Sequence, residues 1–192
     1  MSIKCLLYSS IVPYSIKIML TTKRLFLMPA TQKMLDAAAD QNWNELSSLL
    51  GGVYFAENWT HFPEALVWMR DYMLEHPDEL GWWTYFMIQG LDARVAGTCG
   101  FKGKPTPEGT LEIGYEVAER YQNQGIATEA AAALVKKAFS HPEVTSVIAH
   151  TLPEENASVQ VLRHLSFELE NDATDDEAGP VWRWRKQRDL IV

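Results

Sequence analysis

The chain contains 192 residues, 47% hydrophobic and 22% charged, a composition typical of one globular domain rather than a disordered or fibrous chain. Its formal net charge of −8 argues against sequence-independent binding of nucleic acid, which needs a basic surface to displace counterions. The two cysteines, Cys5 and Cys99, show neither a disulfide framework nor metal-ligand spacing, so we expect no metal site and a reducing, cytoplasmic location.

Residues 1–18 are set apart from the predicted fold. They are moderately apolar but interrupted by Lys4, Pro13 and Lys17, and they lack a small-residue cleavage pattern, so neither a signal peptide nor a membrane span is indicated. We interpret them as a flexible extension or as the product of a start codon upstream of a true start at Met19. The predicted domain then covers residues 19–187, and residues 188–192 form a short tail.

The rest of the chain alternates between strand-like and helix-like segments. Strands are predicted at residues 24–28, 82–88, 94–101, 111–117, 144–149, 167–169 and 181–184, and helices at 32–39, 43–50, 63–75, 126–139 and 156–165. The acidic stretch 168–177 is expected to be largely a solvated loop that attracts cations. This order of elements predicts an α/β domain with a mixed sheet.

The most informative segment is the turn at residues 122–129, between the strand at 111–117 and the alanine-rich helix at 126–139. A helix start carries unpaired N–H groups and the positive end of the helix dipole, so a diphosphate can bind there without a basic side chain. Gly125 permits a positive φ and a close approach of phosphate oxygens to the backbone. The spacing excludes a Walker A loop, and a turn with one glycine excludes the three-glycine Rossmann fingerprint.

This turn, Gln122-x-x-Gly125-x-Ala127, resembles motif A of the GNAT (GCN5-related N-acetyltransferase) family, in which it holds the diphosphate of acetyl-CoA. The flanking segments, Leu111-Glu112-Ile113-Gly114-Tyr115 and Asn156-Ala157-Ser158, are similar to those of the RimJ/RimL branch of ribosomal-protein acetyltransferases. The resemblance includes Leu20 to Leu25 (Leu-Thr-Thr-Lys-Arg-Leu) and Val181 to Trp184, and so extends over roughly residues 19–187.

The resemblance implies a single-domain GNAT fold, α/β (α+β), with a central mixed, mostly antiparallel twisted sheet flanked by helices. It implies an N-acetyltransferase that moves the acetyl group of acetyl-CoA to a primary amine by direct attack in a ternary complex. The cofactor-binding residues that it implies are Tyr115, Val117, Gln122, Asn123, Gln124, Gly125, Ile126, Ala127, Thr128, Asn156 and Ser158. Asn156 has an equal claim to be the N-cap of its helix.

Strand alternation places Glu112, Gly114 and Glu116 on one face of the strand at 111–117. Because Gly114 leaves open space beside it, Glu112 is the predicted general base. In related enzymes a glutamate at this position often removes the proton of the amine through water, while backbone N–H groups at a bulge in the strand polarise the thioester carbonyl. Without the family resemblance, an exposed strand glutamate would be the commoner explanation.

Ser158 is the predicted acid, or else a further cofactor ligand. Many relatives use a tyrosine as the acid, but here Leu162 is followed by Arg163. In the RimJ/RimL branch a serine often stands two residues after the asparagine, and Ser158 fills that position. A serine hydroxyl is a weak acid, so its role remains open between proton donation and cofactor binding.

The acceptor amine, a protein N-terminus or a small molecule, is left open by the sequence. His61 is expected either near the mouth of the acceptor site or simply on the surface. Two alternatives to acetyl transfer remain: a non-catalytic acyl-CoA-binding sensor or interaction module, and an acyltransferase for longer acyl-CoA donors. No nucleic-acid or membrane partner is expected, and the oligomeric state, a homodimer included, stays open.

Overall fold

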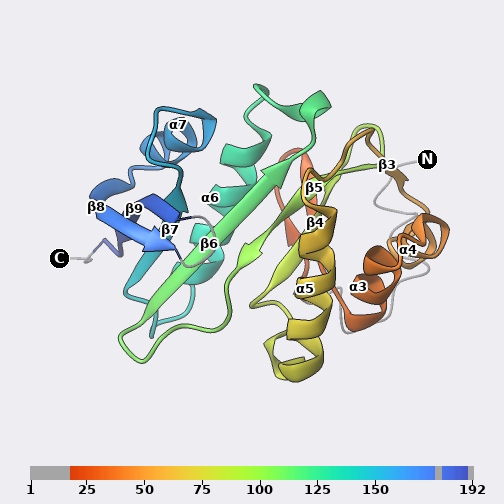
Figure 1. Ribbon diagram of the computed structural model, residues 1–192, viewed down its shortest axis with the longest axis horizontal. Helices are drawn as coiled ribbons and strands as arrows, with labels where there is room; N and C mark the ends of the chain where they lie inside the picture. Colours follow the sequence, from red (N-terminus) through yellow and green to blue (C-terminus); the bar gives the residue numbers. More distant parts are fainter. Residues whose placement is uncertain (1–17, 176–178, 190–192) are drawn as a thin grey trace.

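The computed structural model describes residues 18–175 and 179–189 (Figure 1). The strands are β1 (Leu20–Thr21), β2 (Leu25–Pro29), β3 (Tyr54–Phe55), β4 (Thr84–Gln89), β5 (Arg94–Phe101), β6 (Thr110–Val117), β7 (Ser146–Thr151), β8 (Glu168–Asp175) and β9 (Gly179–Gln187). The helices are α3 (Gln32–Ala39), α4 (Trp43–Leu49), α5 (Pro63–Glu75), α6 (Ile126–Phe139) and α7 (Ala157–His164), with 3-10 turns at Pro77–Glu79 and Glu119–Tyr121. Residues 1–17 of the expected extension lie outside the described residues.

Within the described residues, nine strands form one sheet in the order β1-β2-β4-β5-β6-β7-β9-β8, and β3 pairs with β5 from outside this path. Neighbouring strands are antiparallel except for β3 with β5 and β6 with β7. The prediction of a mixed, mostly antiparallel sheet flanked by helices is confirmed.

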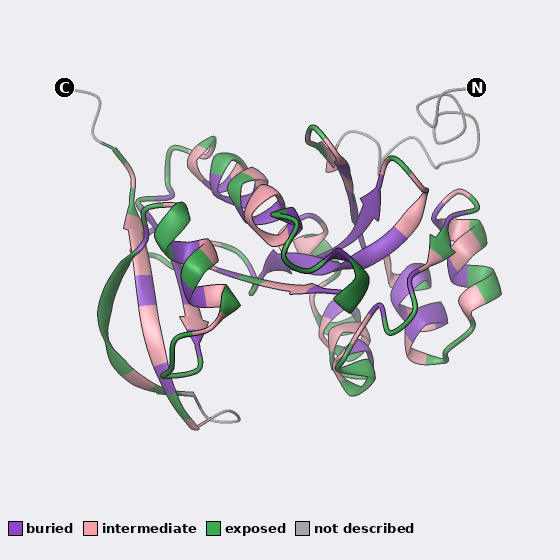
Figure 2. Ribbon diagram, turned by 90° about the horizontal axis from the view of Figure 1, so that it is seen from above, coloured by how far each residue is buried: buried purple, intermediate pink, exposed green. Residues whose placement is uncertain are grey.

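Helices cover both faces of the sheet. Figure 1 shows α5 in front of the central strands and α6 behind them, where α6 packs against β6 and β5. The alanine-rich face of α6 allows this close packing, and its buried stripe is visible in Figure 2. The buried residues of that stripe are Ile126, Ala130, Ala131, Leu134, Val135 and Ala138. The small side chains bring the start of α6 close to the end of β6.

The sheet divides between β6 and β7. These parallel strands pair only where Thr110–Glu112 faces Ser146–Ile148, whereas β7 continues to pair with β9 as far as Thr151. Over residues 113–117, the edge of β6 that faces β7 therefore has no strand partner among the described residues. Backbone groups at such an edge need other partners, so the divergence creates a place where an extended ligand can bind.

The acidic segment after α7 corrects one prediction. Residues 168–175 form the edge strand β8 rather than a solvated loop, while residues 176 and 177 lie outside the described residues. Acidic residues disfavour strands, but β8 pairs along β9, and Glu170 forms ion pairs with Arg183 (3.0 Å) and Arg185 (2.9 Å) across the ladder. Cross-strand pairing therefore overrides local propensity. The strand itself is exposed, as Figure 2 shows at one end of the sheet.

Arg188 belongs to the predicted tail but contacts the domain closely. Its backbone N–H donates to the carbonyl of Thr145 (2.9 Å). Its guanidinium donates to the carbonyls of Phe139 and Val144, each at 2.7 Å, and of His141. Cationic donors at the end of a helix satisfy carbonyls that have no intrahelical partner. The contacts of the fold thus continue one residue beyond the predicted domain end.

Candidate active site

A cavity of about 970 Å³ lies beside the unpaired edge of β6. Its walls come from β6, from the turn that follows β6, from the first turns of α6 and from one side of α7. The residues lining it are His61, Tyr115, Glu116, Val117, Tyr121, Gln122, Asn123, Gly125, Ile126, Ala127, Thr128, Glu129, Ala132, Ala157, Ser158, Gln160, Val161, His164 and Leu165. Segments more than a hundred residues apart in the sequence therefore meet in one concave site.

The start of α6 presents backbone donors to this cavity. Gly125 is the N-cap, has φ +73°, and offers no side-chain hydrogen bond to the helix. The first N–H that bonds back is that of Glu129, to the carbonyl of Gly125 at 3.0 Å. The N–H groups of Ile126, Ala127 and Thr128 therefore have no helical acceptor, and all three residues line the cavity. This is the geometry that an anion site at a helix N-terminus requires.

Arg24 and Glu129 hold this turn in place. The Arg24 Nε lies 2.6 Å from Oε2 of Glu129, and its Nη1 donates to the carbonyl of Gln124 at 2.7 Å. Glu129 also accepts from the Thr22 hydroxyl (2.6 Å) and from the Arg24 backbone N–H (2.7 Å). The segment that precedes β2 is thereby fastened to the first turn of α6. The carboxylate of Glu129 neutralises the positive charge of the Arg24 guanidinium.

The pKa of Glu129 reflects this pairing. Burial by itself raises the pKa of the carboxyl, but hydrogen bonds from Thr22 and Arg24, with the charge of Arg24, outweigh burial and hold the pKa below its ordinary value of 4.5. Glu129 is therefore ionised at neutral pH. A carboxylate in the first turn also suits the positive end of the helix dipole.

The wall formed by α7 is joined to β6 by one hydrogen bond. The Tyr115 hydroxyl donates to the carbonyl of Ser158 at 3.3 Å, and burial raises the pKa of this phenol, which keeps it protonated. Asn156 is the N-cap of α7, since its side chain accepts from the Val159 N–H at 3.0 Å. Ser158 lines the cavity, whereas Asn156 is not among the lining residues described.

Glu112 lies near the point where β6 and β7 separate, between the side chains of Lys102 and His150. Its Oε1 is 2.6 Å from Nζ of Lys102 and 3.0 Å from Nδ1 of His150 on β7, and its side chain is 19% exposed. A Cβ added at Gly114 would meet nothing within 4 Å, so the open space expected beside Glu112 is present. Glu112 itself is not among the described residues that line the cavity.

Glu116 lies further along the same face of β6 and does line the cavity. Its carboxylate accepts from the Thr60 hydroxyl at 3.1 Å and from the backbone N–H of His61. Its backbone is approached closely by Gly97, where an added Cβ would lie 2.0 Å from the Glu116 carbonyl oxygen. The loop before α5 is in this way attached to β6 at the cavity.

The bulge expected in the strand of Glu112 lies elsewhere. Over Ile113–Val117, β6 pairs regularly with β5, and the register shift occurs between β4 and β5 at Met87/Ile88. On β5, Gly97 lies at this shift, opposite Met87 of β4 and Val117 of β6, and has φ +140°, a value that favours glycine. The irregularity thus shapes the strand beside β6 rather than β6 itself.

Comparison with known proteins identifies the family. Residues 24–168, more than half of the chain, match the family model described as acetyltransferase (GNAT) domain. The chain belongs to the GNAT acetyltransferase family. It is 26% identical over 160 residues to the uncharacterized N-acetyltransferase YjdG of Bacillus subtilis (82% of this chain, 94% of YjdG). It is 34% identical over 83 residues to the uncharacterized N-acetyltransferase p20 of Bacillus licheniformis (43% of this chain, 47% of p20).

Solved structures share the fold at low sequence identity. The ribosomal L7/L12 alpha-N-protein acetyltransferase RimL, in complex with coenzyme A, superposes with a TM-score of 0.63 at 20% identity over 88% of this chain and 97% of RimL. The microcin C7 self-immunity acetyltransferase MccE, in complex with acetyl-CoA and AMP, superposes with a TM-score of 0.63 at 16% identity over 93% of this chain and 99% of MccE. These similarities concern the fold alone.

The sequence-predicted site residues of this GNAT acetyltransferase fall into two groups. Those lining the cavity are Tyr115, Val117, Gln122, Asn123, Gly125, Ile126, Ala127, Thr128 and Ser158. Glu112, Gln124 and Asn156 lie outside that lining. Gln124 instead offers its carbonyl to Arg24, and its side chain donates to the Arg120 carbonyl at 2.7 Å.

Sequence reasoning gave no role to Arg24, Glu116 or the contact between Thr60 and β6. The family resemblance of the segment Leu20 to Leu25 could have drawn attention to Arg24. Nothing near Arg24 in the sequence indicated that its partner is Glu129, more than a hundred residues away.

Among the described residues, no helix is long and apolar enough to cross a bilayer. Nor, in residues 18–175 and 179–189, do three or more His, Cys, Asp or Glu side chains gather as a metal site would require.

Proposed function

We propose that this acyltransferase binds acetyl-CoA in the cavity beside β6 and transfers the acetyl group to a primary amine. The observation that carries the proposal is the meeting of two backbone surfaces in one cavity: the first turn of α6, with its free N–H groups, and the edge of β6 at residues 113–117, which pairs with no described strand. The first suits a diphosphate, and the second suits the extended, amide-containing pantetheine arm. On that edge of β6 the Val117 carbonyl already accepts from the Gln122 side chain at 3.0 Å.

Acetyl-CoA would lie between β6 and α7. The N–H groups of Ile126, Ala127 and Thr128 would donate to the diphosphate, and Gly125 leaves room for its oxygens. The arm would follow the edge of β6 at Tyr115 to Val117 and bring the thioester toward Glu116. The hydrogen bond between Tyr115 and the Ser158 carbonyl keeps α7 at a fixed distance from that edge.

The proposed reaction is direct attack within a ternary complex. The lone pair of the neutral amine forms a C–N bond to the thioester carbonyl carbon, the C–S bond breaks, and coenzyme A leaves as a thiolate. The proton lost from nitrogen passes to a base, and the thiolate takes a proton from an acid or from water. Glu112 remains our candidate base, reached through water because it lies outside the cavity lining, and Ser158 our candidate acid.

The free energies of the two proton transfers indicate whether losing the base or losing the acid would slow the reaction more. Presenting a lysine-like amine (pKa near 10.4) in neutral form at pH 7 costs about 4.6 kcal/mol, whereas an α-amine (pKa near 7.8) costs about 1 kcal/mol. Protonation of a leaving thiolate with a cysteine-like pKa near 8.5 contributes at most about 2 kcal/mol. For a lysine-like acceptor, loss of the base should therefore reduce the rate more than loss of the acid.

We further propose the RimJ/RimL branch for this chain. Support comes from the segments Leu111–Val117 and Asn156–Ser158, and from the fold shared with RimL, whose name describes an alpha-N-protein acetyltransferase. An exposed protein N-terminus is then one acceptor class, and a small-molecule amine is the other.

The test is calorimetric titration of the purified protein with acetyl-CoA, with pantetheine as a matched ligand that lacks the diphosphate. We expect micromolar binding of acetyl-CoA and much weaker binding of pantetheine. Thiol release is then measured with an Ala-initiated peptide and with spermidine. Folded protein that fails to bind acetyl-CoA would refute the assignment of the cavity.

Glu112→Gln separates the enzyme from a non-catalytic acyl-CoA sensor. The substitution keeps the shape of the side chain but removes its charge and its capacity as a base. We expect acetyl-CoA affinity to change little and transfer to fall by at least about a hundredfold, the lower range of a general base. Binding of acetyl-CoA by the wild-type protein without thiol release on any amine tested would favour the sensor.

A further inference from the structure

Glu116 is a cavity carboxylate without a cationic partner. Among the described residues, no lysine, arginine or histidine nitrogen lies within ion-pair distance of it, whereas Glu112 and Glu129 each have one at 2.6 Å. Its two hydrogen-bond donors, the Thr60 hydroxyl and the His61 backbone N–H, are neutral. The negative charge of Glu116 in the cavity is therefore left for a ligand to neutralise.

The orientation of this carboxylate is set before any ligand arrives. Thr60 donates to Oε2 and the His61 N–H donates to Oε1, so each oxygen is held by one donor. A carboxylate oxygen accepts two hydrogen bonds, which leaves one acceptor position on each oxygen. On the other side, the close approach of Gly97 to the Glu116 carbonyl fixes the strand that carries the side chain.

Open space lies on the face of β6 that carries Glu116. Gly114 precedes Glu116 on the same face of β6, is exposed, and has nothing within 4 Å of the place where a Cβ would stand. His61, on the loop that reaches Glu116, is exposed and also lines the cavity. A small cationic group can therefore approach Glu116 without displacing a side chain of β6.

We propose that Glu116, oriented by Thr60 and the His61 N–H, binds the ammonium group of the acceptor. The ligand class is a primary ammonium, whose N–H donors match the free acceptor positions on the two carboxylate oxygens. This inference rests on the proposed function, since it places the acceptor amine beside the edge of β6 along which the thioester would lie. Glu116 binds the incoming amine directly, whereas Glu112, whose Cα lies roughly 13 Å away along the strand, would reach the same nitrogen only through ordered water.

The test measures binding rather than turnover, so it does not depend on knowing the natural acceptor. Protein is titrated with n-butylammonium chloride, and backbone amide shifts of Thr60, His61 and Gly114 are followed by NMR. The uncharged control is n-butanol, and sodium chloride controls for ionic strength. We expect saturable shifts with butylammonium alone, and a dissociation constant about tenfold or more higher in Glu116→Gln, because a charge-assisted hydrogen bond is lost.

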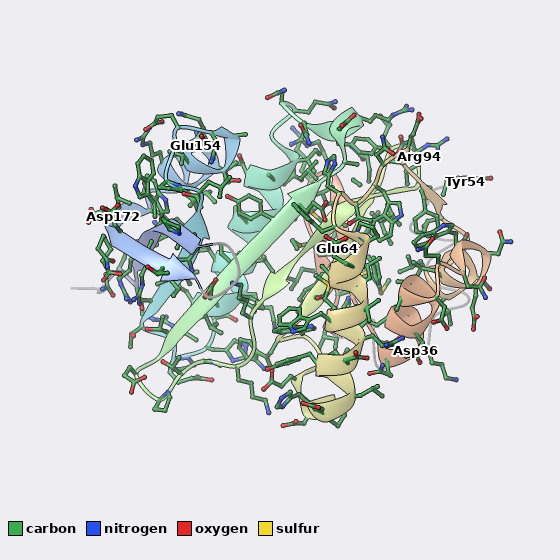
Figure 3. All side chains as sticks on the ribbon, in the orientation of Figure 1. Asp36, Tyr54, Glu64, Arg94, Glu154 and Asp172 are labelled. Atoms are coloured by element: carbon green, nitrogen blue, oxygen red, sulfur yellow. The ribbon has the colours of Figure 1, made fainter. Side chains whose placement is uncertain are left out.

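Two variants control for trivial causes. Glu64→Gln removes the same charge from the exposed start of α5 (Figure 3), close to His61 in sequence, and should leave the dissociation constant within about twofold because exposed charges interact weakly. Glu116→Asp keeps the charge and should retain preference for butylammonium over butanol. Equal shifts with butanol, or unchanged butylammonium binding in Glu116→Gln, would overturn the proposal.

Calorimetry with acetyl-CoA distinguishes this inference from the function on which it rests. Butylammonium binding that depends on Glu116, in a protein that does not bind acetyl-CoA, would leave the cation site standing and remove the transferase assignment. Acetyl-CoA binding without selective ammonium binding would support the transferase assignment and refute the cation site at Glu116.

Discussion

Replacing Gly125 by alanine tests whether phosphate approaches the backbone at the start of α6. Gly125 has φ +73°, and an added Cβ would lie 3.5 Å from Nη2 of Arg24, an ordinary van der Waals contact. The methyl group therefore fits the unliganded fold, and it stands on a residue that lines the cavity. Two effects are expected, a small one on stability and a larger one on binding.

The stability effect comes from the left-handed backbone, which costs an alanine about 1 kcal/mol. For a chain of this size that corresponds to a fall of about 2–4 °C in Tm. The binding effect comes from displaced phosphate oxygens. Loss of one charge-assisted hydrogen bond, worth about 1.5–3 kcal/mol, weakens binding by about 10- to 150-fold.

Gly52→Ala is the matched control. Gly52 has φ +82° and nothing within 4 Å of an added Cβ, so it bears the same backbone cost in a segment outside the cavity lining. Differential scanning calorimetry should show similar losses of Tm in both variants, and titration with acetyl-CoA should show weakened binding in Gly125→Ala alone. If the two variants bind acetyl-CoA equally well, the diphosphate does not contact this turn.

Three further predictions concern the walls of the cavity. Glu129→Gln should lower the free energy of unfolding by about 1–3 kcal/mol near neutral pH. The fold holds the pKa of Glu129 below its ordinary value of 4.5, so this stabilisation is complete above the pKa of the unfolded chain and is lost as the pH falls below it. Urea unfolding of wild type and variant at several pH values should therefore show a difference in free energy that narrows below pH 4.5. A difference that stays constant with pH would contradict the argument. Asn156→Ala should cost about 1 kcal/mol in urea unfolding through loss of the α7 cap, whereas Asn156→Asp, another good N-cap, should recover most of it; equal stabilities would show that the cap is unimportant. Ser158→Ala should lower kcat by at most about 30-fold if the serine protonates the thiolate, so a larger fall in a thiol-release assay would require another role.

Helices were predicted more accurately than strands. Helices α3, α5 and α6 begin and end at the predicted residues, because apolar periodicity and local stop signals such as His141-Pro142 are encoded within each segment. Both ends of β7 and β9 and the start of β4 differ from prediction by two or more residues. A strand ends where its partner ends, and the partner is distant in sequence.

In the candidate site, too, some features follow from adjacent residues and others depend on contacts between distant segments. The phosphate turn follows from adjacent residues, since a glycine before an alanine-rich helix places unpaired N–H groups in a predictable direction. The partners of the three glutamates do not follow from adjacent residues. Glu112 meets His150, Glu116 meets the Thr60 loop, and Glu129 meets the segment before β2.

The sequence alone determined the family, the mixed α/β architecture and the position of the turn at Gly125, because each depends on local pattern and on motifs in order along the chain. Tertiary structure decided which carboxylate of β6 lies in the cavity. Because side chains alternate along a strand, the sequence places Glu112 and Glu116 on the same face of β6 and does not distinguish their roles. Two tertiary features distinguish them: β7 separates from β6 after Glu112, and the loop at His61 contacts Glu116. Those contacts join segments tens of residues apart, and their geometry exists only when the sheet has formed.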